Sequence, residues 1–174
     1  MKKWCLVLIL PFAFFAPLSA ATVSVLIVES GLPSGAARTE SAVVWENGLL
    51  DALFDAGHIV SNIPILRLDA APGREIPLEA RHGFYEARAG GADFFIMVLL
   101  TYGNPGGSSS AGPETGGRPV PSGVFISVFT VSNEKLIYET SVTARSGETP
   151  EEAFLDAKRN AGNIIPRLIL RGRP

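Results

Sequence analysis

The sequence holds little of the chemistry on which most enzymes depend. Among its 174 residues there is one cysteine, Cys5, and there are two histidines, His58 and His82. A single thiol forms no internal disulfide and cannot build a zinc site from paired cysteines. The chain also lacks G-x-S-x-G, H-E-x-x-H and P-loop patterns. We therefore assign no catalytic residue, no cofactor-binding residue and no metal ligand.

Charged residues are also scarce. They make up 18% of the chain, and the formal net charge is −2. Nucleic-acid binding depends on a basic surplus that neutralises phosphates, so the composition excludes nucleic acid as the main partner. Apolar residues contribute 47%, and the length suits one domain of roughly 100–200 residues.

The N-terminus has the layout of a secretory signal. Lys2 and Lys3 are followed by an apolar run over residues 4–16 and by small residues around Ala20. The run is shorter than the roughly 20 residues of a spanning helix, and Pro11 interrupts it. We expect cleavage near Ala20, no membrane span after cleavage, and a periplasmic or secreted protein. A retained membrane anchor is the alternative.

The domain organisation follows from this signal. Residues 1–20 form the signal peptide, and residues 22–174 form a single α/β domain. Cys5 lies inside the signal, so the mature chain contains no thiol. An exported protein of this size without disulfides depends on its hydrophobic core, which fits a bacterial periplasm.

Alternating strands and helices are predicted for the first part of the domain. Residues 22–30, 58–68 and 94–100 are β-branched or continuously apolar, which is typical of covered strands. Pro64 marks a bulge, an edge or a break in the second strand. Helices are predicted over residues 39–57 and from Pro77 to Gly91, with the second helix presenting a small-residue face to the sheet: Ala80, Phe84, Ala87 and Gly91.

The helix over residues 39–57 has a clear apolar stripe. Trp45, Leu49 and Leu53 recur at helical spacing. Val43, Leu50 and Phe54 are interpreted as widening this core-facing stripe, and Asn47, Asp51 and Asp55 lie opposite it. Carboxylates one turn apart on a polar face are expected to be solvated rather than catalytic.

The second part of the domain has a different composition. Residues 103–122 are rich in glycine, proline and serine, which predicts a long loop that is either a binding flap or a disordered insertion. Residues 124–131 and 136–143 read as an antiparallel hairpin, with the first strand inside the sheet and the second more exposed to water. A capping box at Thr149 begins the last helix, and Pro166 should kink or end it.

These elements predict one fold class. We expect a single α/β domain with a mixed β-sheet of about five strands flanked by about three helices. The order is β-α-β-α-β, the long loop, then β-β-α. If the first three strands are parallel, their carboxyl ends meet at one sheet edge. Glu29, Asp69 and Tyr102 would converge there as a binding site.

Two segments resemble a known family. The stretch Gly91 to Ile96 reads GADFFI, and the later hairpin reads VFISVFTVSNEKLIYETSV. This pattern resembles the periplasmic domain family that includes the curli-secretion protein CsgG, the penicillin-binding-protein activator LpoB, the flagellar protein FlgO and the N-terminal domain of TolB. The resemblance covers nearly the whole mature chain, although Ser132 to Lys135 replaces the family's acidic and glycine turn. It implies no catalytic residues, and Asp93 is interpreted as a strand cap.

Two functional hypotheses follow. The resemblance implies an exported, non-enzymatic cell-envelope protein that binds an envelope protein partner or assembles as a homo-oligomer. Such a protein would use the hairpin, the loop at 103–122 or an exposed strand edge. The alternative is a small-ligand-binding or hydrolytic protein with its site at the carboxyl ends of the strands, where Glu29, Asp69 and Tyr102 are expected.

Overall fold

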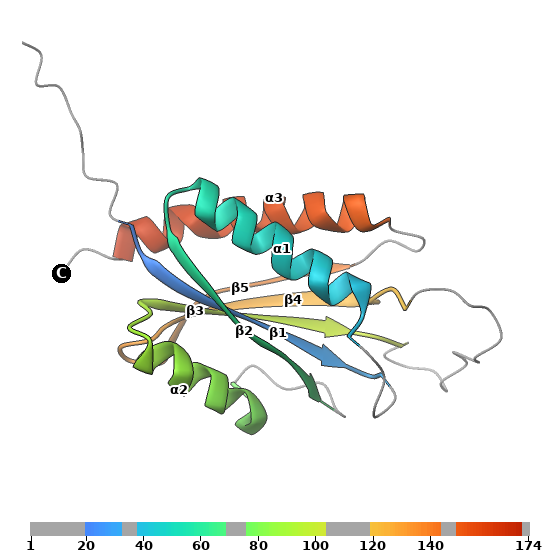
Figure 1. Ribbon diagram of the computed structural model, residues 1–174, viewed down its shortest axis with the longest axis horizontal. Coiled ribbons are helices and arrows are strands. Elements are labelled where there is room, and N and C mark those ends of the chain that lie inside the picture. Colours follow the sequence, from blue (N-terminus) through green and yellow to red (C-terminus); the bar gives the residue numbers. More distant parts are fainter. Residues whose placement is uncertain (1–19, 33–37, 69–75, 104–118, 144–148, 172–174) are drawn as a thin grey trace, which may run out of the picture.

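The computed structural model describes residues 20–32, 38–68, 76–103, 119–143 and 149–171, which fold into one α/β domain (Figure 1). The element order predicted from the sequence is confirmed, with a short 3₁₀ turn added before the second helix. The elements are β1 (Thr22–Ser30), α1 (Glu40–Asp55), β2 (Ile59–Leu68), η1 (Leu78–Ala80), α2 (Arg81–Ala89), β3 (Phe94–Thr101), β4 (Gly123–Thr130), β5 (Lys135–Thr143) and α3 (Pro150–Arg171).

The five strands form one mixed sheet in the order β2-β1-β3-β4-β5. Strand β1 runs parallel to β2 and β3, while β4 is antiparallel to both β3 and β5. The predicted hairpin is therefore confirmed, with β4 inside the sheet and β5 at its edge. Because β1, β2 and β3 are parallel, their carboxyl ends lie at the same edge of the sheet.

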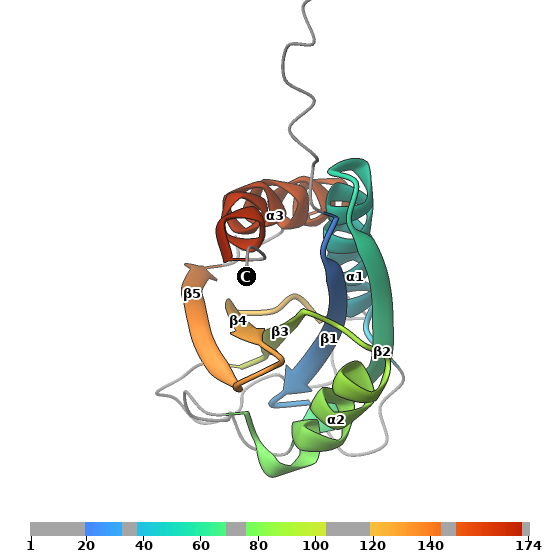
Figure 2. The ribbon, with the colours of Figure 1, turned by 90° about the vertical axis from the view of Figure 1, so that its left-hand side faces the viewer.

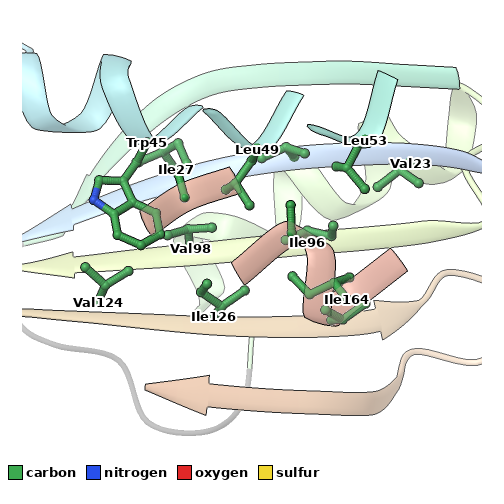
Figure 3. Close-up of a cluster of buried hydrophobic side chains, with 14 of the residues drawn as sticks. Val23, Ile27, Trp45, Leu49, Leu53, Ile96, Val98, Val124, Ile126 and Ile164 are labelled. Atoms are coloured by element: carbon green, nitrogen blue, oxygen red, sulfur yellow. The ribbon is translucent and has the colours of Figure 1, made fainter. Parts of the chain in front are cut away.

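Helices cover the two faces of the sheet unequally. Helices α1 and α3 lie side by side over one face, and α2 lies against the other (Figures 1 and 2). The larger core packs Trp45, Leu49 and Ile164 of these two helices against alternate strand residues (Figure 3). The smaller core lies under α2, where Phe84 meets Phe95 edge to face with ring centroids 5.3 Å apart.

Prolines and glycines account for several element boundaries. The β1–β2 register slips between Leu26 and Val28, opposite Pro64, so this proline lies in a bulge of an edge strand and does not break it. Gly57, with φ +83°, follows the last turn of α1 as predicted. Gly91, with φ +74°, follows α2 and is exposed, so the prediction that it belongs to the buried helix face was wrong.

Of two other proline predictions, that for Pro77 was wrong, and that for Pro166 was wrong in one of its two alternatives. Pro77 precedes the 3₁₀ turn and α2 begins at Arg81, so Pro77 is not the first residue of that helix. Pro166 does not end α3, which continues to Arg171. Pro166 lies on the exposed side of α3, where water can satisfy the carbonyl that loses its partner. Ile164 and Leu168 on either side are fully buried, and their packing favours a continuous helix.

Some sequence predictions concern residues outside the described ranges. These are the signal at residues 1–19 and most of the loop, residues 104–118. Both therefore stay predictions. Among the helices in the described ranges, none combines the length and the apolar character that crossing a bilayer requires.

Candidate functional site

Four side chains meet where the three parallel strands end. Glu29 is the last residue but one of β1, and its partner across the sheet on β2 is Arg67. Tyr102 directly follows β3 and is held beside β1 because its N–H donates to the Ser30 carbonyl at 2.9 Å. Thr39 is the N-cap of α1. We call Glu29, Thr39, Arg67 and Tyr102 the Glu29 network.

Glu29 is the centre of this network. Its side chain is 0% exposed, and Oε2 accepts hydrogen bonds from Arg67 Nε at 3.2 Å and Nη2 at 3.0 Å. Oε1 accepts from the hydroxyl of Thr39 and, at 3.1 Å, from that of Tyr102. A buried carboxylate is tolerated only when it is paired and hydrogen-bonded, and Glu29 meets both conditions.

The hydroxyl protons connect the network to α1. Thr39 Oγ1 lies 2.7 Å from the Tyr102 hydroxyl oxygen and also accepts the Ala42 N–H at 3.1 Å. Each hydroxyl has one proton, so Thr39 donates to Glu29 while the Tyr102 proton is shared between the Thr39 and Glu29 oxygens. Burial raises the pKa of the Tyr102 phenol, which therefore keeps this proton. The same threonine thus caps α1 and joins it to β1.

The backbone around Tyr102 admits only glycine at the turn after β1. Gly31 has φ +85°, and a Cβ atom there would lie 2.2 Å from the Tyr102 carbonyl oxygen. Both the conformation and the contact exclude a side chain. The backbone of Gly31 thus packs closely against the backbone of Tyr102, which holds the Tyr102 side chain in place within the network.

The network has the chemistry of a structural ion pair. A general base needs an accessible lone pair directed at substrate, whereas both oxygens of Glu29 already accept two hydrogen bonds from the protein. The structure places Glu29 and Tyr102 together at the strand ends, and Asp69 lies outside the described residues. A ligand site at these residues stays a prediction.

Sequence reasoning missed two members of the network. Arg67 is the single charged residue within β2, which was a signal that this position has a buried partner. Thr39 has a residue type that commonly caps helices. Neither signal identified Glu29 as the common partner, because the register of β1 against β2 was unknown.

The remaining polar candidates do not form a reactive cluster. Lys158 Nζ lies 2.6 Å from Asp51 Oδ2 and 3.4 Å from Asp55 Oδ2 at the surface. His58 is buried, and its Nδ1 accepts the Ala21 N–H at 3.2 Å. Within the described ranges no three histidine, cysteine or acidic residues are grouped to hold a metal ion. Asp93 accepts the Thr22 N–H at 2.8 Å and so caps β1.

An apolar surface on α1 is the second candidate site. The side chain of Phe54 is 69% exposed, so the prediction that it widens the core-facing stripe was wrong, as it was for the exposed Val43. The helix packs through Trp45, Leu49 and Leu53, and Phe54 points to one side of that contact. Phe54 borders a shallow depression of about 400 Å³, the Phe54 surface, lined by Asn47, Leu50, Asp51, Phe54, Val60 and Phe154.

Comparisons with known proteins show a likeness of fold. No protein family matches the chain, and no curated protein matches it in sequence. Solved structures similar to it include a PelC dodecamer from Paraburkholderia phytofirmans, with 15% identity and a TM-score of 0.45 over 86% of this chain and 87% of that chain. The C-terminal domain of LpoB from Escherichia coli has 12% identity and a TM-score of 0.40 over 75% and 87%. Lipoprotein GNA1162 from Neisseria meningitidis has 12% identity and a TM-score of 0.42 over 84% and 99%. LpoB belongs to the family that the GADFFI strand and the hairpin resemble, and the likeness concerns the fold alone.

Proposed function

We propose that this chain is an exported, non-enzymatic protein of the cell envelope that binds a protein partner through the Phe54 surface. Export would depend on the signal predicted for residues 1–20. The observation that carries the proposal is the exposure of Phe54 beside an apolar depression. Large apolar side chains that cluster at one place on the surface of a soluble protein are typical of interaction sites.

The Phe54 surface has the layout of a protein interface. Leu50, Phe54, Val60 and Phe154 supply an apolar centre contributed by α1, β2 and α3. The ion pairs of Lys158 with Asp51 and Asp55 lie at its border. An apolar centre with a polar rim is the usual anatomy of such interfaces, and aromatic residues are prominent among their energetic hot spots.

The energetics of Phe54 support the same function. Full burial of a phenylalanine side chain contributes about 1.5–3 kcal/mol, and most of the Phe54 side chain still faces water. A partner that covers it gains a large share of that free energy without any rearrangement of the core. At the strand ends, the Glu29 carboxylate is already fully hydrogen-bonded, so a partner would gain no comparable free energy by binding there.

Capture of partners from envelope extract tests the proposal. The tagged protein would be crosslinked in the extract beside the variants Phe54→Ser and Leu78→Ser. Leu78 is a matched control because it is a 79% exposed apolar residue next to α2, on the other face of the sheet. We expect a specific protein with the wild type and Leu78→Ser, and at least a tenfold lower yield with Phe54→Ser. Equal yields from all three proteins would refute the assignment of this surface.

Sedimentation of the purified protein identifies the kind of partner. A homo-oligomer that dissociates with Phe54→Ser, and not with Leu78→Ser, would show that a second copy occupies the Phe54 surface. A wild-type monomer that captures another envelope protein would show a heterologous partner.

A further inference from the structure

A second pocket lies on the opposite side of the sheet from the Phe54 surface. It has a volume of about 350 Å³ and lies between α2 and the β4–β5 hairpin. The tip of that hairpin lies beside α2, and Arg88 Nη1 is 3.7 Å from Glu134 Oε1 across the gap (Figure 1). The pocket is therefore a hollow between two elements that are joined at one end.

Two aromatic rings in the wall of this pocket are supported by the core. Phe84 and Phe129 contribute to it, and each ring also contacts Phe95 in the core, with centroids 5.3 and 6.4 Å apart. Phe84 and Phe129 are themselves almost fully buried. Tyr85 packs edge to face on Phe84 at 6.3 Å and is 52% exposed at the rim. A ligand would thus meet the Tyr85 ring, which rests on aromatic packing that is already ordered.

The charges of the pocket favour an anion. Glu134 and Arg81 both line it. The carboxylate of Glu134 is offset by Arg88, whereas Arg81 has no ion-pair partner among the residues that the structure describes. The guanidinium of Arg81 therefore places a positive charge beside the Tyr85 ring at the rim. Guanidinium groups bind carboxylates through two parallel hydrogen bonds.

We propose that this pocket binds the carboxyl-terminal residue of a peptide chain that ends in an apolar side chain. The side chain packs on Tyr85 and on the half-buried Ile76 and Leu136, and the terminal carboxylate binds Arg81. The volume lies near the lower end of the roughly 300–1,000 Å³ typical of ligand pockets, which suits a single residue. The exposed side chain of Tyr85 at the rim of the pocket provides an apolar flank for the preceding residue, which favours a peptide over a free small carboxylate.

Titration of the ¹⁵N-labelled protein with short peptides, followed by NMR, tests this proposal. The probes are acetyl-Gly-Gly-Phe with a free carboxylate, its carboxyl-terminal amide, acetyl-Gly-Gly-Ser and N-acetylphenylalanine. Shifts of the amide signals of Tyr85, Glu134 and Leu136 report on the pocket. Because Arg81 is exposed, its ion pair is partly screened, and we expect the amide to bind about fivefold more weakly than the acid.

The variants Arg81→Gln and Arg159→Gln separate a direct contact between Arg81 and the carboxylate from the effect of the protein's overall charge. Arg159 is an exposed arginine on α3 and serves as the control. Arg81→Gln should bind the acid and the amide equally, and Arg159→Gln should keep the difference. The serine peptide and N-acetylphenylalanine should each bind more weakly than the phenylalanine peptide. Equal binding of acid and amide by the wild type, or equal binding of N-acetylphenylalanine, would overturn the proposal.

Discussion

Replacing Glu29 by glutamine tests how far the Glu29 network stabilises the fold. The carboxylate accepts from Arg67 on one oxygen and from Thr39 and Tyr102 on the other. Glutamine has one acceptor oxygen and an NH₂ group. An NH₂ directed at Arg67 faces hydrogen-bond donors, whereas an NH₂ directed at Thr39 and Tyr102 can donate to their hydroxyl oxygens only if the hydroxyl protons reorient. The substitution therefore removes the negative charge that pairs with Arg67 and also disrupts the hydrogen bonds at one of the two oxygen positions.

The expected loss follows from the exposure of the two charges. Removing one partner of a buried ion pair costs about 3–5 kcal/mol. Arg67 is 26% exposed, so water compensates for part of this loss, and we expect the free energy of unfolding to fall by about 2–3 kcal/mol. For a domain of this size each kcal/mol corresponds to roughly 2–4 °C, so Tm should fall by about 4–12 °C.

Urea unfolding followed by tryptophan fluorescence measures this change. In the chain without residues 1–20 the only tryptophan is Trp45, which is buried in the larger core. The double variant Glu29→Met with Arg67→Met is the control, because replacing both charges by apolar groups removes the unpaired charge. It should be more stable than Glu29→Met alone. A loss below about 0.5 kcal/mol for Glu29→Gln would refute this interpretation of the network.

Two further predictions concern glycine packing and pH. Gly48→Ala should lower stability by about 1–3 kcal/mol, because the new Cβ would lie 2.7 Å from a side-chain carbon of α3 and 2.8 Å from a backbone oxygen of α3. At Gly162 a Cβ atom would meet open space, so Gly162→Ala should raise stability by up to about 1 kcal/mol. Equal changes in the free energy of unfolding for the two variants, measured in urea, would contradict the close α1–α3 contact at Gly48. Burial lowers the pKa of His58 below its usual 6.5, so the unfolded chain takes up a proton first and stability should fall as pH is lowered through that value. Unfolding curves measured between pH 7.5 and 5 test this assignment. His58→Gln should reduce the pH dependence of stability, whereas His82→Gln, which changes an exposed histidine, should keep it. The reverse result would contradict the role of His58.

Local chemistry explains why much of the fold was predictable. Thr149 and Glu152 form the reciprocal hydrogen bonds of a capping box, at 2.9 and 3.2 Å, and α3 begins with Pro150 as predicted. Gly57 follows α1 because its positive φ is a local property of glycine. The continuous apolar run of β3 identified a strand covered on both faces. Each of these signals depends on residues close together in the sequence.

The errors and omissions concern tertiary packing. Phe54 has an apolar side chain at a helical interval, yet the sequence does not show how wide the contact of α1 with the sheet and α3 is. Pro166 is tolerated in α3 because its neighbours pack on the sheet while it faces solvent. The pairing of Glu29 with Arg67 depends on strand register across 38 residues of sequence, which no local pattern provides.

Photocrosslinking in the cells that produce the protein tests the central claim most directly. A photoreactive phenylalanine analogue would replace Phe54 in one strain and Leu78 in another. We predict a discrete crosslinked species at position 54, containing either another envelope protein or a second copy of the chain, and little product at position 78. Crosslinking at position 78 alone, or none above background at position 54, would contradict a partner-binding role for the Phe54 surface.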